Sequence, residues 1–136
     1  MRSIFLIFVC CLFGFAGIAQ DCKEDRLALF DKLTCEAKLA NKKIVIYLAY
    51  QGCPNCRNME ESTLSNEAVR RELGTNCVYL TLDAIRNFDG IELVGKYHIQ
   101  YFPATIVFDK DGNKLALAEN FLNVSGFLNL IQGSSR

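Results

Sequence analysis

Two cysteines three positions apart are the residues of this sequence best suited to chemistry. They stand in the run Gly52-Cys53-Pro54-Asn55-Cys56, directly after an apolar stretch and at the start of a segment that favours a helix. At the first turn of a helix, free backbone N–H groups and the positive end of the helix dipole stabilise a thiolate relative to a thiol. We therefore interpret the pair, supported by Gly52, Pro54 and Asn55, as a redox centre that exchanges disulfides.

The proline between the cysteines indicates different roles for them. Pro54 suits the first helical position, because the N–H that proline lacks has no partner there. Cys53 is then the N-cap residue with its sulfur at the exposed end, and Cys56 lies on the same face of the first turn, within reach of Cys53. We expect Cys53 to attack, with a thiol pKa below the free value of about 8.5, and the more buried Cys56 to resolve the mixed disulfide.

Two structural interpretations of the pair stay open beside the catalytic one. A structural disulfide would have the same geometry, although closing a loop of two intervening residues removes little chain entropy. A zinc site would need two further ligands, and the chain offers only His98, Cys22, Cys35 and Cys77, none at paired ligand spacing. We expect no metal and no organic cofactor, and we expect His98 to lie structurally at the end of a helix.

Composition describes an ordinary folded chain. The sequence has 136 residues, of which 51% are hydrophobic and 22% charged, in the range of one globular domain. Its 15 basic and 15 acidic side chains balance to a formal charge of zero. Nucleic-acid binding, which needs clustered Lys and Arg, is therefore not expected. Seven cysteines are the one compositional excess.

The first 19 residues have the layout of a secretory signal peptide. Arg2 precedes an uncharged apolar run from Ile4 to Ala19 that ends in small residues. The alternative is a membrane anchor, but the run is shorter than the roughly 20 residues that cross a bilayer. We expect cleavage after Ala19, so that residues 1–19 are the signal peptide and residues 20–136 form an exported domain, periplasmic or secreted.

Export would leave five cysteines in a compartment where disulfides persist. Cys22 and Cys35 would lie about 20 Å apart along one predicted helix, beyond the separation of about 7 Å that a disulfide tolerates. Pairing of either residue with Cys77 stays open. The other interpretation of Cys35 is a small buried core residue.

The elements that must position the cysteine pair alternate along the chain. Apolar spacing and capping residues predict helices over 23–40, 54–62, 66–73 (ending before Gly74), 90–97 and 124–131. Continuous or alternating apolar runs predict strands over 43–50, 78–82, 105–108 and 114–118, the last two joined by a hairpin turn. This order predicts an α/β fold, a mixed sheet covered by helices on both faces.

The motifs follow one another as in the thioredoxin superfamily, which the sequence resembles over nearly all of residues 20–136. The evidence is KIVIYLAYQGCPNC, then a strand ending in Asp83, then YHIQYFPATIVFDKDGNKL. Residues 56–61 and 64–69 are most similar to small exported thioredoxin-like proteins and to the C-terminal periplasmic domain of DsbD. The resemblance implies a thioredoxin fold with a mixed four-stranded sheet.

The resemblance also implies roles for individual residues. Cys53 would be the attacking and Cys56 the resolving cysteine, with Pro103 a cis-proline packed against them. The backbone of Phe102 would then bind an extended segment of a substrate protein by strand addition.

Departures from the superfamily pattern concern proton transfer and the substrate groove. Tyr47 and Tyr79 align with the buried acid and its partner lysine, so deprotonation of Cys56 needs another base or water. Gly52 replaces the usual tryptophan. Tyr101 and Asn120 replace glycines that line the groove.

The sequence thus predicts an exported thiol-disulfide oxidoreductase that acts on cysteines of other proteins. It would be a monomer, free of the membrane after signal cleavage, and would exchange electrons with a further redox partner protein. Whether the protein reduces the disulfides of its substrates, or instead oxidises or isomerises them, stays open. The alternative is a thioredoxin-like binding or chaperone module with little redox turnover, which the missing proton-transfer partners favour.

Overall fold

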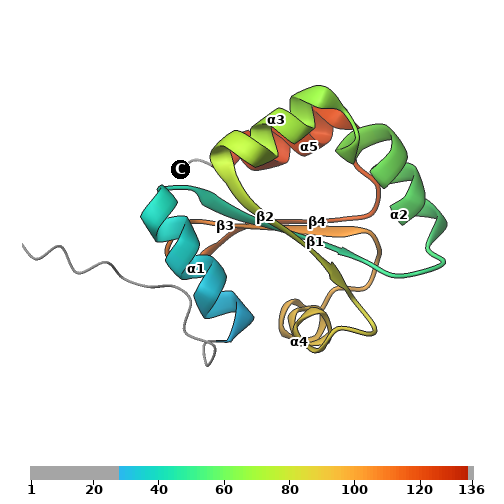
Figure 1. Ribbon diagram of the computed structural model, residues 1–136. Coiled ribbons are helices and arrows are strands. Elements are labelled where there is room, and N and C mark those ends of the chain that lie inside the picture. The colour runs from blue at the N-terminus through green and yellow to red at the C-terminus, as the bar shows by residue number, and fades with distance from the viewer. Residues whose placement is uncertain (1–27, 135–136) are drawn as a thin grey trace, which may run out of the picture.

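The computed structural model describes residues 28–134, and its elements follow the predicted order (Figure 1). The helices and strands, in chain order, are α1 (Leu29–Ala40), β1 (Lys43–Ala49), α2 (Pro54–Met59), the π-helical turn η1 (Glu60–Leu64), α3 (Glu67–Asn76), β2 (Cys77–Asp83), α4 (Phe88–Tyr97), β3 (Ala104–Phe108), β4 (Lys114–Glu119) and α5 (Val124–Gly133).

The four strands form one mixed sheet in the order β2-β1-β3-β4. Strand β1 pairs in parallel with β2 and antiparallel with β3, and β3 pairs antiparallel with β4. Every residue of β1 after Lys43 is buried, as a strand needs to be when helices cover both sides of it. The predicted α/β architecture is confirmed.

The helices divide between the two faces of this sheet. Figure 1 shows α1 and α4 on one face and α2, α3 and α5 on the other. Each face has its own core: Leu33 and Leu93 belong to the cluster under α1 and α4, whereas Met59 and Phe127 belong to the cluster under α2, α3 and α5. The cysteine pair lies in the second cluster.

The segment after the cysteine pair departs from the prediction. Helix α2 ends at Met59 and passes into the η1 turn, and α3 then continues through Gly74 to Asn76. The predicted stop before Gly74 is wrong, because Gly74 does not adopt the left-handed conformation of a C-cap glycine. Its carbonyl instead accepts a hydrogen bond from Lys42 Nζ at 3.0 Å.

His98 lies at the end of α4, as predicted. It is the C-cap residue of this helix, in the left-handed conformation with φ 53°, and it is exposed. Within residues 28–134, no group of three or more His, Cys, Asp and Glu side chains is placed to hold a metal ion. None of the helices in the same range is long and apolar enough to cross a membrane.

Candidate active site

The cysteine pair lies where the buried strand β1 gives way to α2. Gly52 makes the turn with φ 92°, a conformation that side-chain-bearing residues rarely adopt. Cys53 is the N-cap residue of α2 and Pro54 occupies the first helical position, as predicted. The backbone N–H of Cys56 donates to Cys53 Sγ at 3.1 Å. One N–H group at the start of this helix therefore points at the sulfur of Cys53.

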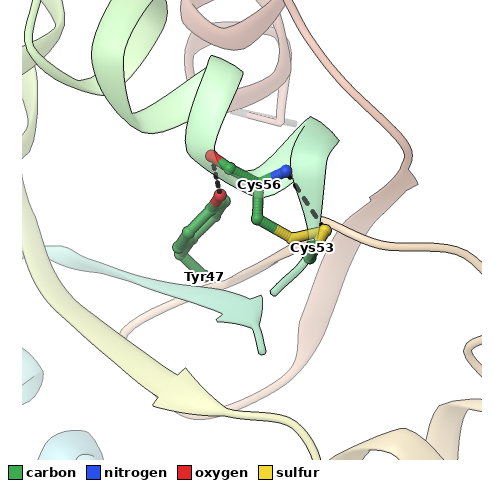
Figure 2. Close-up of a disulfide and its surroundings, with 3 residues drawn as sticks. All are labelled: Tyr47, Cys53 and Cys56. Atoms are coloured by element: carbon green, nitrogen blue, oxygen red, sulfur yellow. Dashed lines mark hydrogen bonds between the residues drawn. A yellow bond between two sulfur atoms is a disulfide. The ribbon is translucent and has the colours of Figure 1, made fainter. Parts of the chain in front are cut away.

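The two cysteines form a disulfide, with their Cα atoms 5.3 Å apart (Figure 2). Cys53 is 6% exposed and Cys56 is 2% exposed. Cys56 is the more buried of the two cysteines, as predicted. The expectation that the Cys53 sulfur is freely exposed is wrong. The partly buried side chains of Tyr50 and Phe102 pack against the cluster that contains Cys53. Pro54 and Asn55, between the cysteines, are exposed.

Tyr47 lies beneath the cysteine pair, fully buried in β1 (Figure 2). Its hydroxyl donates a hydrogen bond to the backbone oxygen of Cys56 at 3.3 Å. Burial, followed by the charge of Glu60 and the neighbouring Tyr79, raises the pKa of Tyr47 far above its ordinary value. The phenol therefore stays neutral near pH 7 and is a hydrogen-bond donor in a place where the superfamily has an acid.

Tyr79 is the second tyrosine of this cluster. Burial raises its pKa as well, while a hydrogen bond from Thr81 lowers it and the charge of Glu60 raises it. The Thr81 hydroxyl donates to the Tyr79 oxygen at 2.9 Å. Both tyrosines are therefore uncharged at neutral pH.

A cavity of about 330 Å³ opens beside the disulfide, between the ends of β1 and β2 and the start of α2. Both cysteines line it, together with the charged residues Glu60, Asp83 and Arg57. Glu60 was missed by the sequence analysis. Its position four residues after Cys56 is the signal that could have found it, since residues i and i+4 share a helix face.

The predicted substrate-binding residues lie in the loop between α4 and β3. The Phe102–Pro103 peptide bond is cis, which confirms that expectation. Phe102 packs against the cluster that holds the cysteine pair, and its ring meets the Tyr50 ring edge to face, with centroids 5.5 Å apart. Pro103 is buried. The structure thus brings Phe102 and the cysteine pair into one cluster.

The pairings with Cys77 that the sequence left open do not form. Cys77 is free and buried, and Cys35 is disulfide-bonded, so the pairings of Cys35 or Cys22 with Cys77 are wrong. Cys77 belongs to the cluster under α2, α3 and α5, whereas α1, which carries Cys35, covers the opposite face of the sheet. Cys22 and the predicted signal peptide over residues 1–19 lie outside the described residues.

The chain is similar in sequence to a known domain family and to larger proteins. Residues 30–131 match the family model described as a thioredoxin-like domain. The chain is 30% identical over 103 residues to the thiol:disulfide interchange protein DsbD of Yersinia enterocolitica, covering 74% of this chain and 18% of that protein. It is 24% identical over 100 residues to DsbD of Yersinia pestis, covering 72% of this chain and 17% of the relative. The chain therefore spans less than a fifth of the length of these relatives.

Solved structures are similar at lower sequence identity. A thioredoxin from Thermus thermophilus superposes with a TM-score of 0.66 at 18% identity, covering 75% of this chain and 80% of that one. The C-terminal domain of Neisseria meningitidis DsbD in its oxidised form superposes with a TM-score of 0.63 at 17% identity, covering 75% and 89%. The sheet order and helix placement of this chain are those of the thioredoxin fold.

Proposed function

Because this chain belongs to the thioredoxin-like domain family, we propose that it is a thiol-disulfide oxidoreductase acting on cysteines of other proteins through Cys53 and Cys56. The observation that carries the proposal is the Cys53–Cys56 disulfide at the start of α2, with the Cys56 N–H directed at the Cys53 sulfur. The family, the fold and the DsbD relatives support this class of activity.

The chemistry runs through a mixed disulfide. In the reduced protein, the Cys53 thiolate attacks one sulfur of a substrate disulfide, forming a Cys53–substrate disulfide and releasing the other substrate sulfur as a thiolate, which takes up a proton. Cys56 then loses its proton and attacks Cys53 Sγ. The second substrate thiol leaves, the Cys53–Cys56 disulfide forms, and two electrons have passed to the substrate. A dithiol partner protein reduces the pair again, and the reverse sequence oxidises a substrate dithiol.

The proton of Cys56 goes to the Glu60 carboxylate, directly or through water in the shared cavity. Glu60 is the acidic residue of this cavity whose charge also acts on Tyr47. Tyr47 already donates to the Cys56 backbone oxygen and stays neutral, so it holds the helix start and takes up no proton.

A substrate segment binds beside the loop between α4 and β3. In this loop, Phe102 and Pro103 offer the substrate a backbone edge and an apolar surface. The substrate segment lies along the loop as an added strand. Tyr101 is 59% exposed at this loop and adds an aromatic side chain to the surface.

Cellular placement completes the proposal. Residues 1–19 are removed as a signal peptide, and the domain over residues 20–136 acts as a monomer outside the cytoplasm, periplasmic or secreted. Intact-mass analysis of protein from the native host tests this, and we expect a chain that begins at Gln20. Recovery of a species with Met1 from the cytosol would contradict export.

Reduction of insulin by dithiothreitol tests the activity. We expect the wild-type protein to accelerate the reaction and a Cys53→Ser/Cys56→Ser protein not to do so. The reduction potential of the pair, measured against glutathione, then sets the direction. A value near that of thioredoxin supports a reductase, and a much higher value supports an oxidase or isomerase.

A second function, a binding or chaperone module with little turnover, is favoured by two observations. The sulfurs are largely covered, and neutral Tyr47 and Tyr79 stand where the superfamily has a charged pair. Such a module would bind a reduced, unfolded protein without accelerating insulin reduction.

A further inference from the structure

A single carboxylate holds the loop that leads to Phe102 and Pro103. Glu119, the last residue of β4, is paired in register with Ala104, the first residue of β3. This register places Glu119 beside the loop that precedes β3. Its Oε2 atom accepts hydrogen bonds from the backbone N–H groups of Gln100 and Tyr101, at 2.8 and 2.7 Å.

These two hydrogen bonds fix a segment that has no regular secondary structure. Residues 99–103 lie between α4 and β3, so the N–H groups of Gln100 and Tyr101 have no helix or strand partner of their own. Bonds to a carboxylate are stronger than bonds between neutral groups. Because one oxygen accepts from both consecutive amides, it constrains the direction of the backbone at Tyr101 as well as its distance from β4.

A continuous set of contacts leads from this carboxylate to the cysteine pair. The chain passes from Tyr101 into Phe102, whose ring meets the Tyr50 ring edge to face. The backbone oxygen of Tyr50 in turn accepts the N–H of Cys53 at 3.2 Å. The position of the loop is therefore set from two sides, by Glu119 at its start and by Tyr50 next to the redox-active turn.

We infer that Glu119 is a positioning residue for substrate binding: its carboxylate holds residues 100–103 at the distance from Cys53 that an extended, disulfide-bearing polypeptide segment requires. The inference rests on the proposed function and deepens it. Glu119 itself touches no reacting atom, and it acts through the loop backbone and through the exposed Tyr101 side chain that the loop carries.

Three substitutions separate the hydrogen bonds from charge and from bulk. Glu119→Leu keeps the size of the side chain and removes the acceptor. Glu119→Asp keeps the charge but is one methylene shorter, so that its carboxylate falls short of the two amides. Glu119→Gln keeps an acceptor oxygen at full length without the charge. Glu36→Leu is the matched control. Glu36 is an exposed glutamate of α1, on the face of the sheet opposite to α2 and the cysteine pair.

The readout is the split between KM and kcat for insulin reduction, with dithiothreitol in excess. We expect the Leu and Asp variants to raise KM for insulin about five- to tenfold, the factor that corresponds to the net free energy of about one ordinary hydrogen bond, with kcat within about twofold of wild type. Glu119→Gln should recover most of the affinity, and Glu36→Leu should match wild type. Reduction of the Cys53–Cys56 disulfide by dithiothreitol alone, a reagent too small to need the loop, should be unchanged in all four variants.

Amide hydrogen exchange at Gln100 and Tyr101 checks the contact itself, and it should be faster in Glu119→Leu and Glu119→Asp. Faster exchange with an unchanged KM would overturn the inference. So would kcat and the dithiothreitol rate falling together with affinity, because that pattern belongs to a general structural role. If Glu119→Leu does not fold, the Asp and Gln pair decides the question. A wild-type protein without turnover would instead refute the proposed function, and the inference with it.

Discussion

Two cysteine sites in the same core cluster are about equally buried, but one is a disulfide and the other is a free thiol. Cys53 and Cys56 are 6% and 2% exposed, and Cys77 is 5% exposed. All three contribute to the cluster under α2, α3 and α5. Burial therefore does not distinguish the redox pair from the free thiol.

Their places on the helices do distinguish them. Cys53 caps the N-terminus of α2 and receives the N–H of Cys56, whereas Cys77 follows the last residue of α3 as its C-cap. The positive end of a helix favours a thiolate and the negative end disfavours one. Burial, and after it the charge of Glu72, raises the pKa of Cys77 from the ordinary 9.0 to about 11. The comparison teaches that equally buried cysteines can lie at opposite ends of helices, and we expect this difference to separate the reactive cysteines from the unreactive one.

The largest expected effect comes from removing the sulfur at the N-terminal position. Cys53→Ser should lower insulin reduction by at least about 100-fold, because it deletes the nucleophile. Cys77→Ala should keep activity within about twofold of wild type, since a thiol with a raised pKa at a helix C-terminus takes no part in exchange. The dithiothreitol-coupled assay measures both. Equal loss in the two variants would break the comparison.

The next effect separates the two members of the pair. Cys56→Ser should accumulate covalent complexes between Cys53 and partner proteins, because the resolving thiol is missing. Cys53→Ser should trap few complexes and react slowly with iodoacetamide at neutral pH. Mass spectrometry of non-reduced extracts identifies the complexes. Equal trapping by both variants would refute the assignment of Cys53 as nucleophile, and trapping by neither would favour the binding module.

A smaller effect is expected for the proton of Cys56. Glu60→Gln should slow release of the mixed disulfide about tenfold, below the usual contribution of a general base, because water in the open cavity replaces the carboxylate. Tyr47→Phe, which removes only a bond to a backbone oxygen, should change this rate less than about threefold. Stopped-flow measurement between pH 6 and 9 tests both, and higher pH should partly restore the Glu60→Gln rate. A larger loss in Tyr47→Phe would move the proton path to the tyrosine.

Local features of the active site could be predicted from the sequence because neighbouring residues determine them. The run over residues 43–50 is apolar without interruption and forms the buried central strand. Pro54 fixed the helix start, and with it the capping role of Cys53. The cis bond before Pro103 followed from the resemblance to the thioredoxin superfamily, whose motif order extends over residues 43–115.

What the sequence analysis missed depends on contacts between distant residues. The packing of Phe102 against the cluster that contains Cys53 joins segments 49 positions apart, and the bond from Gln100 to Glu119 depends on the register of two strands. The pairing of Cys35 stayed open in the sequence because nothing in the spacing of cysteines reports on which face of the sheet a helix lies, and the sheet separates α1 from Cys77. Gly74 was mistaken for a helix stop because a glycine in open space fits a helix interior at a cost of only about 1 kcal/mol.

The smallest expected effect concerns Cys77 and is measured as the pH dependence of the free energy of unfolding. Because folding raises the pKa of Cys77 from 9.0 to about 11, the folded protein retains the thiol proton in a pH range where the unfolded chain has lost it. This contribution is complete below about pH 9 and is lost as the pH rises toward 11. Between pH 8 and pH 10 it should remove about 1 kcal/mol from the free energy of unfolding.

Cys77→Ala provides the measurement. It lowers stability at every pH by leaving a small cavity, but it removes the titrating group, so its free energy of unfolding should fall less between pH 8 and pH 10 than that of wild type. The buried Tyr47, whose pKa is also raised, adds the same alkaline loss to both proteins and cancels in the difference. Urea unfolding at the two pH values gives the four free energies. Parallel pH dependence of the two proteins would mean that Cys77 ionises as readily as a free thiol, and a raised thiol pKa would no longer account for an unreactive Cys77.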